Sequence, residues 1–287
     1  MLNKILIATD FSPASDCLIQ CAGQLKKLGL KQVVLAHVVY VANTPGLDEI
    51  LLDEASPQME RQKKRLEAED LKVGTELAVG IAAPVLEALA TSHRVDAILI
   101  GSRGRGLAKS ALGSVSFKLL QITNHPVFLS RITAEGHNQT CGVATGPRWF
   151  EKILFATDFS PPADRAAAYL EQILRHHSTT VTLLHVSDAA DQARLAPKYL
   201  QERQEHDQRR LEEIARQLAP GGGSISSELA IGNPAEEIIA RTRTGQISLV
   251  VMGSHGKGFF REALLGSVAN EVARRAEAPV LLVPGVR

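Results

Sequence analysis

The chain has 287 residues, enough for about two ordinary domains, and 45% of them are hydrophobic, as in a globular protein with buried cores. The formal net charge is only +1, so no excess of positive charge favours nucleic acid or an acidic membrane surface as a partner. The N-terminal apolar run is too short for a signal peptide, and no apolar run reaches the roughly 18 residues of a membrane span. We therefore expect a cytoplasmic protein.

The cysteines are consistent with this location. Cys17, Cys21 and Cys141 form an odd number and lack the spacing of a disulfide or zinc site, which suits a reducing compartment. Cys17 and Cys21 lie four residues apart on an expected helix. We predict that they are small packing residues, with a shared metal ion as the alternative.

Short apolar runs alternate with longer segments of helical period along the chain. In the first half the runs lie at 3–9, 33–39, 73–79, 95–101 and 126–130, and in the second half at 151–157, 180–186, 225–231, 247–253 and 279–283. The polar segments 48–71 and 190–218, with their spaced leucines, predict amphipathic helices. This alternation predicts an α/β fold in which each half forms a five-stranded parallel sheet with helices on both faces.

The two halves repeat each other. Residues 4–13, KILIATDFSP, return as residues 152–161, KILFATDFSP, with nine of ten positions identical. The repeat continues through later segments of both halves, and it breaks at 133–148, which is rich in Gly, Thr and polar residues. We therefore predict a first module at 1–132, a linker at 133–148 and a second module at 149–287, called module 1 and module 2 below.

Polar residues and glycines follow the expected strands. In a parallel sheet, ligands collect at the carboxyl ends of the strands, where the strand order reverses. The groups at these ends are Asp10, His37-Val38 and Gly101 in module 1, and Asp158, His185-Val186 and Gly253 in module 2. The sequence thus predicts one binding cleft in each module.

A glycine-rich loop follows the fourth strand of module 2. Gly253-Ser-His-Gly256-Lys-Gly258 is followed by Gly266-Ser267-Val268 at the start of a helix. Glycines allow the main chain to approach an oxyanion and to adopt positive φ, and amides at a helix start bind phosphate favourably. The loop is not a Walker A motif, because Gly256-Lys257-Gly258 lacks the continuation Gly-Lys-Ser/Thr. We therefore expect the backbone to hold most of the phosphate.

Almost all of both repeats resembles the universal stress protein family. The first strand ends in Asp, the second strand ends in His-Val, and a Gly-x2-Gly-x9-Gly-Ser/Thr motif comes after the fourth strand. The resemblance implies a doubly wound sheet and, as in ATP-binding members, adenosine beside the Asp and Val positions and ribose and phosphates at the glycine motif. The residues that it assigns to the cofactor in module 2 are Asp158, Val186, Gly253, His255, Gly256, Gly266, Ser267 and Val268.

Module 1 departs from the motif. Its loop has eight residues instead of nine before Gly113-Ser114, and Arg103 stands where module 2 has His255. A shorter loop can displace a phosphate-facing amide, whereas Arg103 and Arg105 can bind phosphate directly. The corresponding binding residues of module 1 are Asp10, Val38, Gly101, Arg103, Gly104, Gly113 and Ser114.

Structural interpretations remain open beside the functional ones. Asp10 and Asp158 can cap the following helix, with or without ligand contact. His37 and His185 can be core imidazoles instead of catalytic bases, His255 can be a turn residue, and Gly101 and Gly253 can serve tight turns. Ser248, where module 1 has Asp96, is a further departure at the start of the fourth strand.

The leading hypothesis is a regulatory protein of the stress response that binds ATP, or AMP or ADP, with Mg²⁺ as a further candidate. A slow ATP-hydrolysing enzyme is the first alternative, but we find no P-loop lysine and no kinase catalytic-loop pattern. We assign no catalytic and no metal-ligating residue. The second alternative is a scaffold that binds no nucleotide, or a different small molecule.

The duplication also predicts assembly. Family members commonly pair through their last strand, which implies that 127–129 and 280–283 pair the two modules within one chain and remove exposed edges. Homodimerisation is a further possibility.

Overall fold

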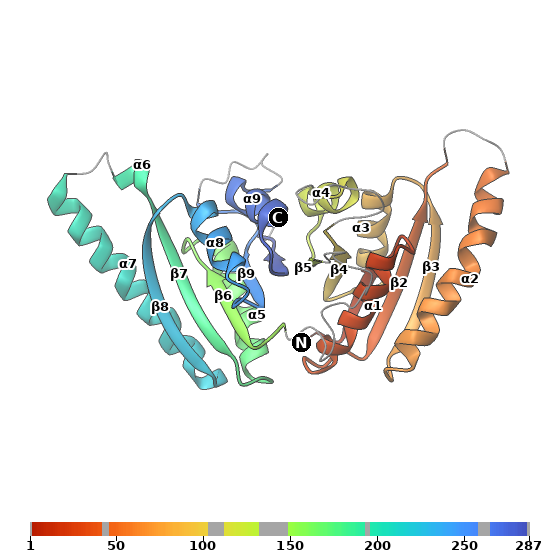
Figure 1. The fold of residues 1–287 in the computed structure, drawn as a ribbon, viewed down its shortest axis with the longest axis horizontal. Helices are drawn as coiled ribbons and strands as arrows, with labels where there is room; N and C mark the ends of the chain where they lie inside the picture. The colour runs from red at the N-terminus through yellow and green to blue at the C-terminus, as the bar shows by residue number, and fades with distance from the viewer. Residues whose placement is uncertain are drawn as a thin grey trace. The chain divides into compact units, whose positions relative to one another are not determined.

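The computed structural model describes residues 2–41, 46–102, 112–131, 149–192, 196–257 and 265–285. The chain divides into two compact units, Met1–Pro147 and Arg148–Arg287, and Figure 1 shows the helices and strands of both. The predicted linker, 133–148, lies outside the described residues. Within the described ranges, no helix is both long enough and apolar enough to cross a membrane.

Module 1 alternates strands and helices. Its elements are β1 (Lys4–Ala8), α1 (Pro13–Lys26), β2 (Gln32–Val39), α2 (Leu47–Glu67), β3 (Lys72–Val79), α3 (Ala82–Ser92), β4 (Ala97–Gly101), α4 (Ser114–Ile122) and β5 (Val127–Ser130).

Module 2 repeats this order, with a short extra helix before its longest one and a 3₁₀ turn after it. Its elements are β6 (Lys152–Ala156), α5 (Pro161–Leu174), β7 (Thr180–Asp188), α6 (Ala189–Gln192), α7 (Pro197–Leu218), η1 (Ala219–Gly221), β8 (Ser224–Gly232), α8 (Pro234–Arg243), β9 (Leu249–Gly253), α9 (Ser267–Arg275) and β10 (Val280–Val283). Every predicted strand ends within two residues of an observed one.

Each module is a doubly wound parallel sheet, which confirms the predicted fold class. The strand order is β3-β2-β1-β4-β5 in module 1 and β8-β7-β6-β9-β10 in module 2. The chain steps outward from the first strand to the third and then returns to the other side of the first. The order therefore reverses between β1 and β4, and between β6 and β9, where the carboxyl ends of the strands leave room for a ligand.

Helices cover both faces of each sheet. In module 2, α5 packs against α7 on one face, and α8 packs against α9 on the other; in module 1 the pairs are α1 with α2 and α3 with α4. The central strands β4 and β9 are almost entirely buried. Strands covered on both faces require continuous apolar runs, which is why the sequence pattern located them.

N-cap residues mark the starts of helices α1 and α8. Ser12 precedes α1 and accepts a hydrogen bond from the Ser15 amide. The side chain of Asn233 accepts hydrogen bonds from the amides of Ala235 and Glu236, and Pro234 opens α8. These caps orient the helices whose first turns lie beside the strand ends.

The structure corrects the interpretation of Asp10 and Asp158 as helix caps. The N-cap residues of α1 and α5 are Ser12 and Ser160. Asp10 Oδ1 and Asp158 Oδ1 instead accept the backbone amide of the serine two residues later, at 3.0 and 3.1 Å. The aspartates therefore shape the turn that leads into the helix.

The exchange of Asp96 for Ser248 has no bearing on the predicted site. Asp96 Oδ2 accepts hydrogen bonds from the amides of Asn3 and Lys4 at 2.7 and 2.8 Å. Ser248 Oγ accepts from the Lys152 amide at 2.9 Å. Both side chains therefore tie down the amino end of a central strand, opposite the end at which the glycine loop begins.

The two cysteines of α1, Cys17 and Cys21, differ in their bonding state. Both are buried, as expected for packing residues. Cys21 is a free thiol, and burial raises its pKa to about 12, against a smaller opposing effect of a hydrogen bond with Ser130. Cys17 is disulfide-bonded, which corrects the expectation that the cysteines form no disulfide.

Candidate functional site

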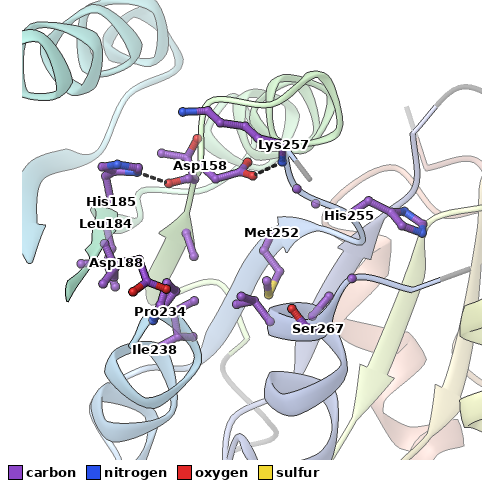
Figure 2. Close-up of a pocket in the computed structure, with 18 of the residues that line it drawn as sticks. Asp158, Leu184, His185, Asp188, Pro234, Ile238, Met252, His255, Lys257 and Ser267 are labelled. Carbon is purple, nitrogen blue, oxygen red and sulfur yellow. Dashed lines mark hydrogen bonds between the residues drawn. The ribbon is translucent and has the colours of Figure 1, made fainter. Parts of the chain in front are cut away.

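A pocket of about 510 Å³ opens at the carboxyl ends of β6, β7 and β9 in module 2, at the predicted reversal of strand order. Leu184, Ile238 and Met252 contribute apolar walls (Figure 2). All eight residues predicted for this module line the pocket: Asp158, Val186, Gly253, His255, Gly256, Gly266, Ser267 and Val268.

Helix α9 begins at one end of this pocket. Its N-cap residue, Gly266, has no side chain with which to cap the helix, and Ser267 and Val268 of the first turn line the pocket. The positive end of the helix dipole and the first backbone amides therefore lie at the pocket wall. Such a helix start binds anions.

Of the loop glycines that the structure describes, Gly253, Gly256 and Gly266 serve close approach and not positive φ, contrary to one part of the sequence interpretation. Positive φ among the described glycines occurs elsewhere in the chain. A Cβ atom on Gly266 would lie 3.2 Å from His255 Cα and from Ser254 O, and one on Gly253 would lie 3.0 Å from the backbone of α5. Side chains at these positions would separate the backbone segments that form the pocket wall.

Asp158 ties the glycine loop to the sheet. Its Oδ2 accepts a hydrogen bond from the Lys257 amide at 2.8 Å, shown as a dashed line in Figure 2. Its Oδ1 accepts from the amide and the hydroxyl of Ser160 at 3.1 and 2.5 Å. A Cβ atom on Gly256 would lie 2.5 Å from Asp158 Oδ2. The carboxylate and Gly256 therefore form one unit that sets the position of the loop.

The residue after each aspartate is strained. Phe11 and Phe159 adopt φ values of 56° and 61°, a region that bulky side chains rarely occupy. The Phe159 amide donates to Thr157 Oγ1 at 3.0 Å, and its ring packs on His185 with 4.4 Å between ring centroids. Such strain persists where the surroundings over-determine it, and it clusters at functional sites. The same strained conformation occurs in both modules, directly after an aspartate that lines the pocket.

His185 lies buried beside the pocket. Its Nδ1 donates to Thr157 O at 2.8 Å, because a carbonyl oxygen can only accept. Its Nε2 lies 3.6 Å from Oδ2 of Asp207, a buried carboxylate on α7. Burial lowers the pKa of His185, while the bond to Thr157 and the charge of Asp207 oppose this effect. His185 is thus a buried, neutral imidazole at neutral pH, in agreement with the core interpretation.

His255 contributes to the pocket mainly through its backbone. The residue is 9% exposed, and its Nδ1 lies 2.7 Å from Ser254 Oγ. Figure 2 shows the ring directed away from Asp158, Met252 and Ser267. The sequence predicted His255 as a site residue, and His255 lines the pocket, but the sequence could not indicate the direction of its side chain.

The polar residues of the pocket that the sequence interpretation did not assign to the site include Ser187, Asp188, Arg203 and Lys257. Lys257 stands inside the glycine motif, and its Nζ lies 5.3 Å from the centroid of the Phe159 ring. Ser187 and Asp188 directly follow Val186 in β7, a proximity that could have suggested them. Arg203 belongs to α7, and no signal in the sequence connects it with the strand ends.

Module 1 has a smaller pocket of about 330 Å³ at the equivalent position. Asp10, Val38, Gly101, Gly113 and Ser114 of the predicted set line it. Arg103 and Gly104 lie outside the described residues. Asp10 Oδ1 accepts from the hydroxyls of Ser12 and Ser15. No cationic side chain lines this pocket in the described part of module 1, in contrast to module 2.

Comparison with known proteins identifies the family. The model of the universal stress protein family matches residues 1–131 and 150–284. A universal stress protein of Mycolicibacterium smegmatis is 28% identical over 97% of this chain and 96% of its own length. Universal stress protein MJ0577 of Methanocaldococcus jannaschii is 29% identical over 47% of this chain and 94% of its own length.

A solved structure also matches this chain over nearly its whole length. The crystal structure of a universal stress protein from Archaeoglobus fulgidus is similar to this chain with a TM-score of 0.73 and 26% sequence identity, and the match covers 99% of each chain. The sequence repeat and the doubly wound sheet of each module agree with these matches. The chain belongs to the universal stress protein family and carries two family modules in tandem.

Proposed function

We propose that module 2 binds an adenine nucleotide, with its phosphates at the start of α9 and its nucleoside along the apolar walls of the pocket. The observation that carries this proposal is the pocket itself, which joins a helix N-terminus and a glycine loop to apolar side chains. Asp158, Val186, the loop glycines Gly253, Gly256 and Gly266, and Ser267 and Val268 are the proposed binding residues, with the backbone of His255.

The apolar walls of the pocket are needed to account for the affinity of a bound nucleotide. A micromolar ligand needs about 8 kcal/mol of binding free energy, whereas a helix terminus supplies only about 1 kcal/mol. The nucleoside must therefore contribute much of the affinity. Leu184, Ile238 and Met252 offer the apolar surface that a planar base requires.

The hydrogen bonds of Asp158 are consistent with nucleotide binding and not with rapid ATP hydrolysis. The two oxygens of Asp158 accept three hydrogen bonds from Ser160 and Lys257. A carboxylate held in this way is poorly placed to serve as a general base or as a principal Mg²⁺ ligand. We therefore propose that any Mg²⁺ is carried by the phosphates and that ATP hydrolysis, if present, is slow.

Nucleotide binding alone can regulate the protein. A ligand present at 100 times its Kd stabilises the form that binds it by about 2.7 kcal/mol. Such a ligand shifts an equilibrium only between forms that bind it differently. The proposed role in the stress response is therefore a nucleotide-dependent change in stability or in affinity for a partner. We retain as predictions the cytoplasmic location, the pairing of β5 with β10 and the formation of homodimers.

The first experiment identifies the ligand. Freshly purified protein is denatured, the released small molecules are identified by mass spectrometry, and adenine nucleotide is counted per chain. One equivalent supports a site in module 2, and two equivalents extend the proposal to module 1. If no nucleotide is released and Mg-ATP does not bind in titration, the scaffold alternative replaces the proposal.

A matched pair of variants assigns the site. In Gly266→Val the new side chain would collide with the backbone at Ser254 and His255, and we expect it to abolish ATP binding to module 2. Gly113→Val places the same change before α4 in module 1 and should leave binding to module 2 intact. Circular dichroism checks that both variants fold. Unchanged affinity in folded Gly266→Val would contradict the assignment.

A further inference from the structure

The mouth of the module 1 pocket carries exposed apolar side chains. Tyr40 and Ile81 are 68% and 65% exposed, and Val115, in the first turn of α4, is 37% exposed and lines the pocket. Tyr40 directly follows β2, and Ile81 comes two residues after β3. The last residues of these parallel strands, Val39 and Val79, pair with each other, so both side chains lie at the carboxyl edge of the sheet, where the pocket opens. Exposed apolar residues that gather in this way mark a site of interaction.

Ile81 stands where module 2 has a helix cap. It is the N-cap residue of α3 and makes no side-chain cap hydrogen bond, whereas Asn233 caps α8 with two such bonds. Isoleucine is among the least favourable residues at an N-cap, and this one is also exposed to solvent. The next residue, Ala82, lines the pocket. The start of α3 therefore gives no reason for an isoleucine here, whereas contact with an apolar ligand at the pocket mouth does.

Two further polar groups of module 2 are replaced in module 1. Ser187 and Asp188 end β7 and line the module 2 pocket. By strand register, Val39 and Tyr40 take these places in module 1. A hydroxyl and a carboxylate are thus exchanged for an aliphatic and an aromatic side chain. Together with Ile81, these exchanges reduce the hydrogen-bonding capacity that the pocket mouth offers to a ligand.

Three polar side chains inside the module 1 pocket are bonded to the protein itself. Ser116 Oγ donates to a carbonyl oxygen of β4 at 2.7 Å, and His37 Nδ1 donates to a carbonyl oxygen just after β1 at 2.8 Å. Asp10 Oδ1 accepts from two serine hydroxyls, and among the described residues Asp10 is the one charged side chain that lines the pocket. Leu18 and Leu86 supply apolar walls. The described lining therefore offers a ligand mainly apolar surface.

We propose that module 1 binds an uncharged, apolar small molecule in this pocket, with Leu86 and Val115 as walls and with Tyr40 and Ile81 covering its outer end. The pocket volume of about 330 Å³ lies within the range of small-molecule sites. This site is separate from the nucleotide site proposed for module 2 and does not depend on it. A ligand bound here stabilises module 1 by mass action, so the two modules respond to ligands of different chemistry.

The first measurement compares two fluorescent ligands that differ in one charged group. N-phenyl-1-naphthylamine is uncharged, and 8-anilinonaphthalene-1-sulfonate is the same aromatic amine with a sulfonate. Both are titrated into the full chain, because their fluorescence rises when they leave water. We expect one equivalent of the uncharged probe to bind, roughly tenfold more tightly than the sulfonate. The sulfonate is included because Arg103 and Arg105, which can bind an anion, lie outside the described residues.

Matched variants assign the uncharged probe to module 1. Val115→Asp places a carboxylate on the pocket wall in the first turn of α4, where a negative charge favours the helix, and should weaken probe binding roughly tenfold or more. Val268→Asp makes the same change in the first turn of α9 and should leave the Kd of the probe within twofold.

A third variant separates loss of binding from loss of folding. Ile81→Asn gives α3 the kind of cap that Asn233 gives α8. It should weaken the probe roughly threefold to tenfold while raising the melting temperature. A lower affinity in a more stable protein cannot result from unfolding.

Each contrary result overturns the proposal. Absence of probe binding up to the solubility limit does so outright, and tighter binding of the sulfonate would show a site for anions. Equal losses in Val115→Asp and Val268→Asp would place the probe outside this pocket, and displacement of the probe by saturating Mg-ATP would make the pocket a nucleotide site. The affinity of Val115→Asp for ATP at module 2 should equal that of the wild type, so this proposal and the proposed function fail separately.

Discussion

The contact between Gly256 and Asp158 gives the sharpest prediction, through the variant Gly256→Ala. The added methyl group would lie 2.5 Å from Asp158 Oδ2, and the two atoms would have to separate by about 0.9 Å to reach an ordinary contact of 3.4 Å. Ser160 holds the other carboxylate oxygen through two hydrogen bonds. The carboxylate therefore cannot yield easily, and the loop must move instead.

Movement of the loop breaks the 2.8 Å hydrogen bond between the Lys257 amide and Asp158 Oδ2. A hydrogen bond to a charged group contributes about 1.5–3 kcal/mol. If the loop must return to its original position when ATP binds, the loss of this hydrogen bond weakens the affinity for ATP roughly 10- to 150-fold. Calorimetric titration measures the affinity, and thermal unfolding measures the stability.

The control for this variant is Gly74→Ala in β3, where an added Cβ atom would meet no heavy atom within 4 Å. We expect it to retain the wild-type affinity and melting temperature. The reasoning is refuted if Gly256→Ala binds ATP within twofold of the wild-type affinity and unfolds at the same temperature. That result would mean that the loop does not depend on Asp158 for its position.

Two further predictions concern stability. Because burial lowers the pKa of His185 below its ordinary value of 6.5, the unfolded chain takes up a proton first as the pH falls. The stabilising effect of the neutral ring is complete above about pH 6.5 and declines below it, toward the native pKa. Urea unfolding at several pH values should show this loss, and His185→Gln should remove that part of the slope; an identical slope in the variant would contradict the assignment. Asp96→Ala removes the acceptor of the Asn3 and Lys4 amides and should lower the free energy of unfolding by about 1–3 kcal/mol. Ser248→Ala should have a smaller effect, and neither should change the Kd for ATP, since both side chains lie at the amino ends of their strands. A changed Kd in either variant would place these side chains in the site after all.

Local sequence patterns were sufficient for the framework. The strands β4 and β9 are buried on both faces, so their continuous apolar runs predicted them directly. The duplication located the second set of strands, and the Gly-x2-Gly-x9-Gly-Ser motif located the glycine loop before Ser267. These features were predictable because burial and backbone geometry restrict residue type over short stretches of chain.

Contacts between distant segments were decided by the tertiary structure. Lys257 and Asp158 are 99 residues apart, and nothing local predicts that the amide of one meets the carboxylate of the other. Asp207 reaches His185 because α7 packs along β7. The direction of the His255 ring and the true caps of α1 and α5 depended in the same way on neighbouring segments. The sequence by itself determined the fold and predicted the residues that line the pocket of module 2. The packing of helices on strands decided which polar atoms meet there, because such contacts leave no periodic pattern.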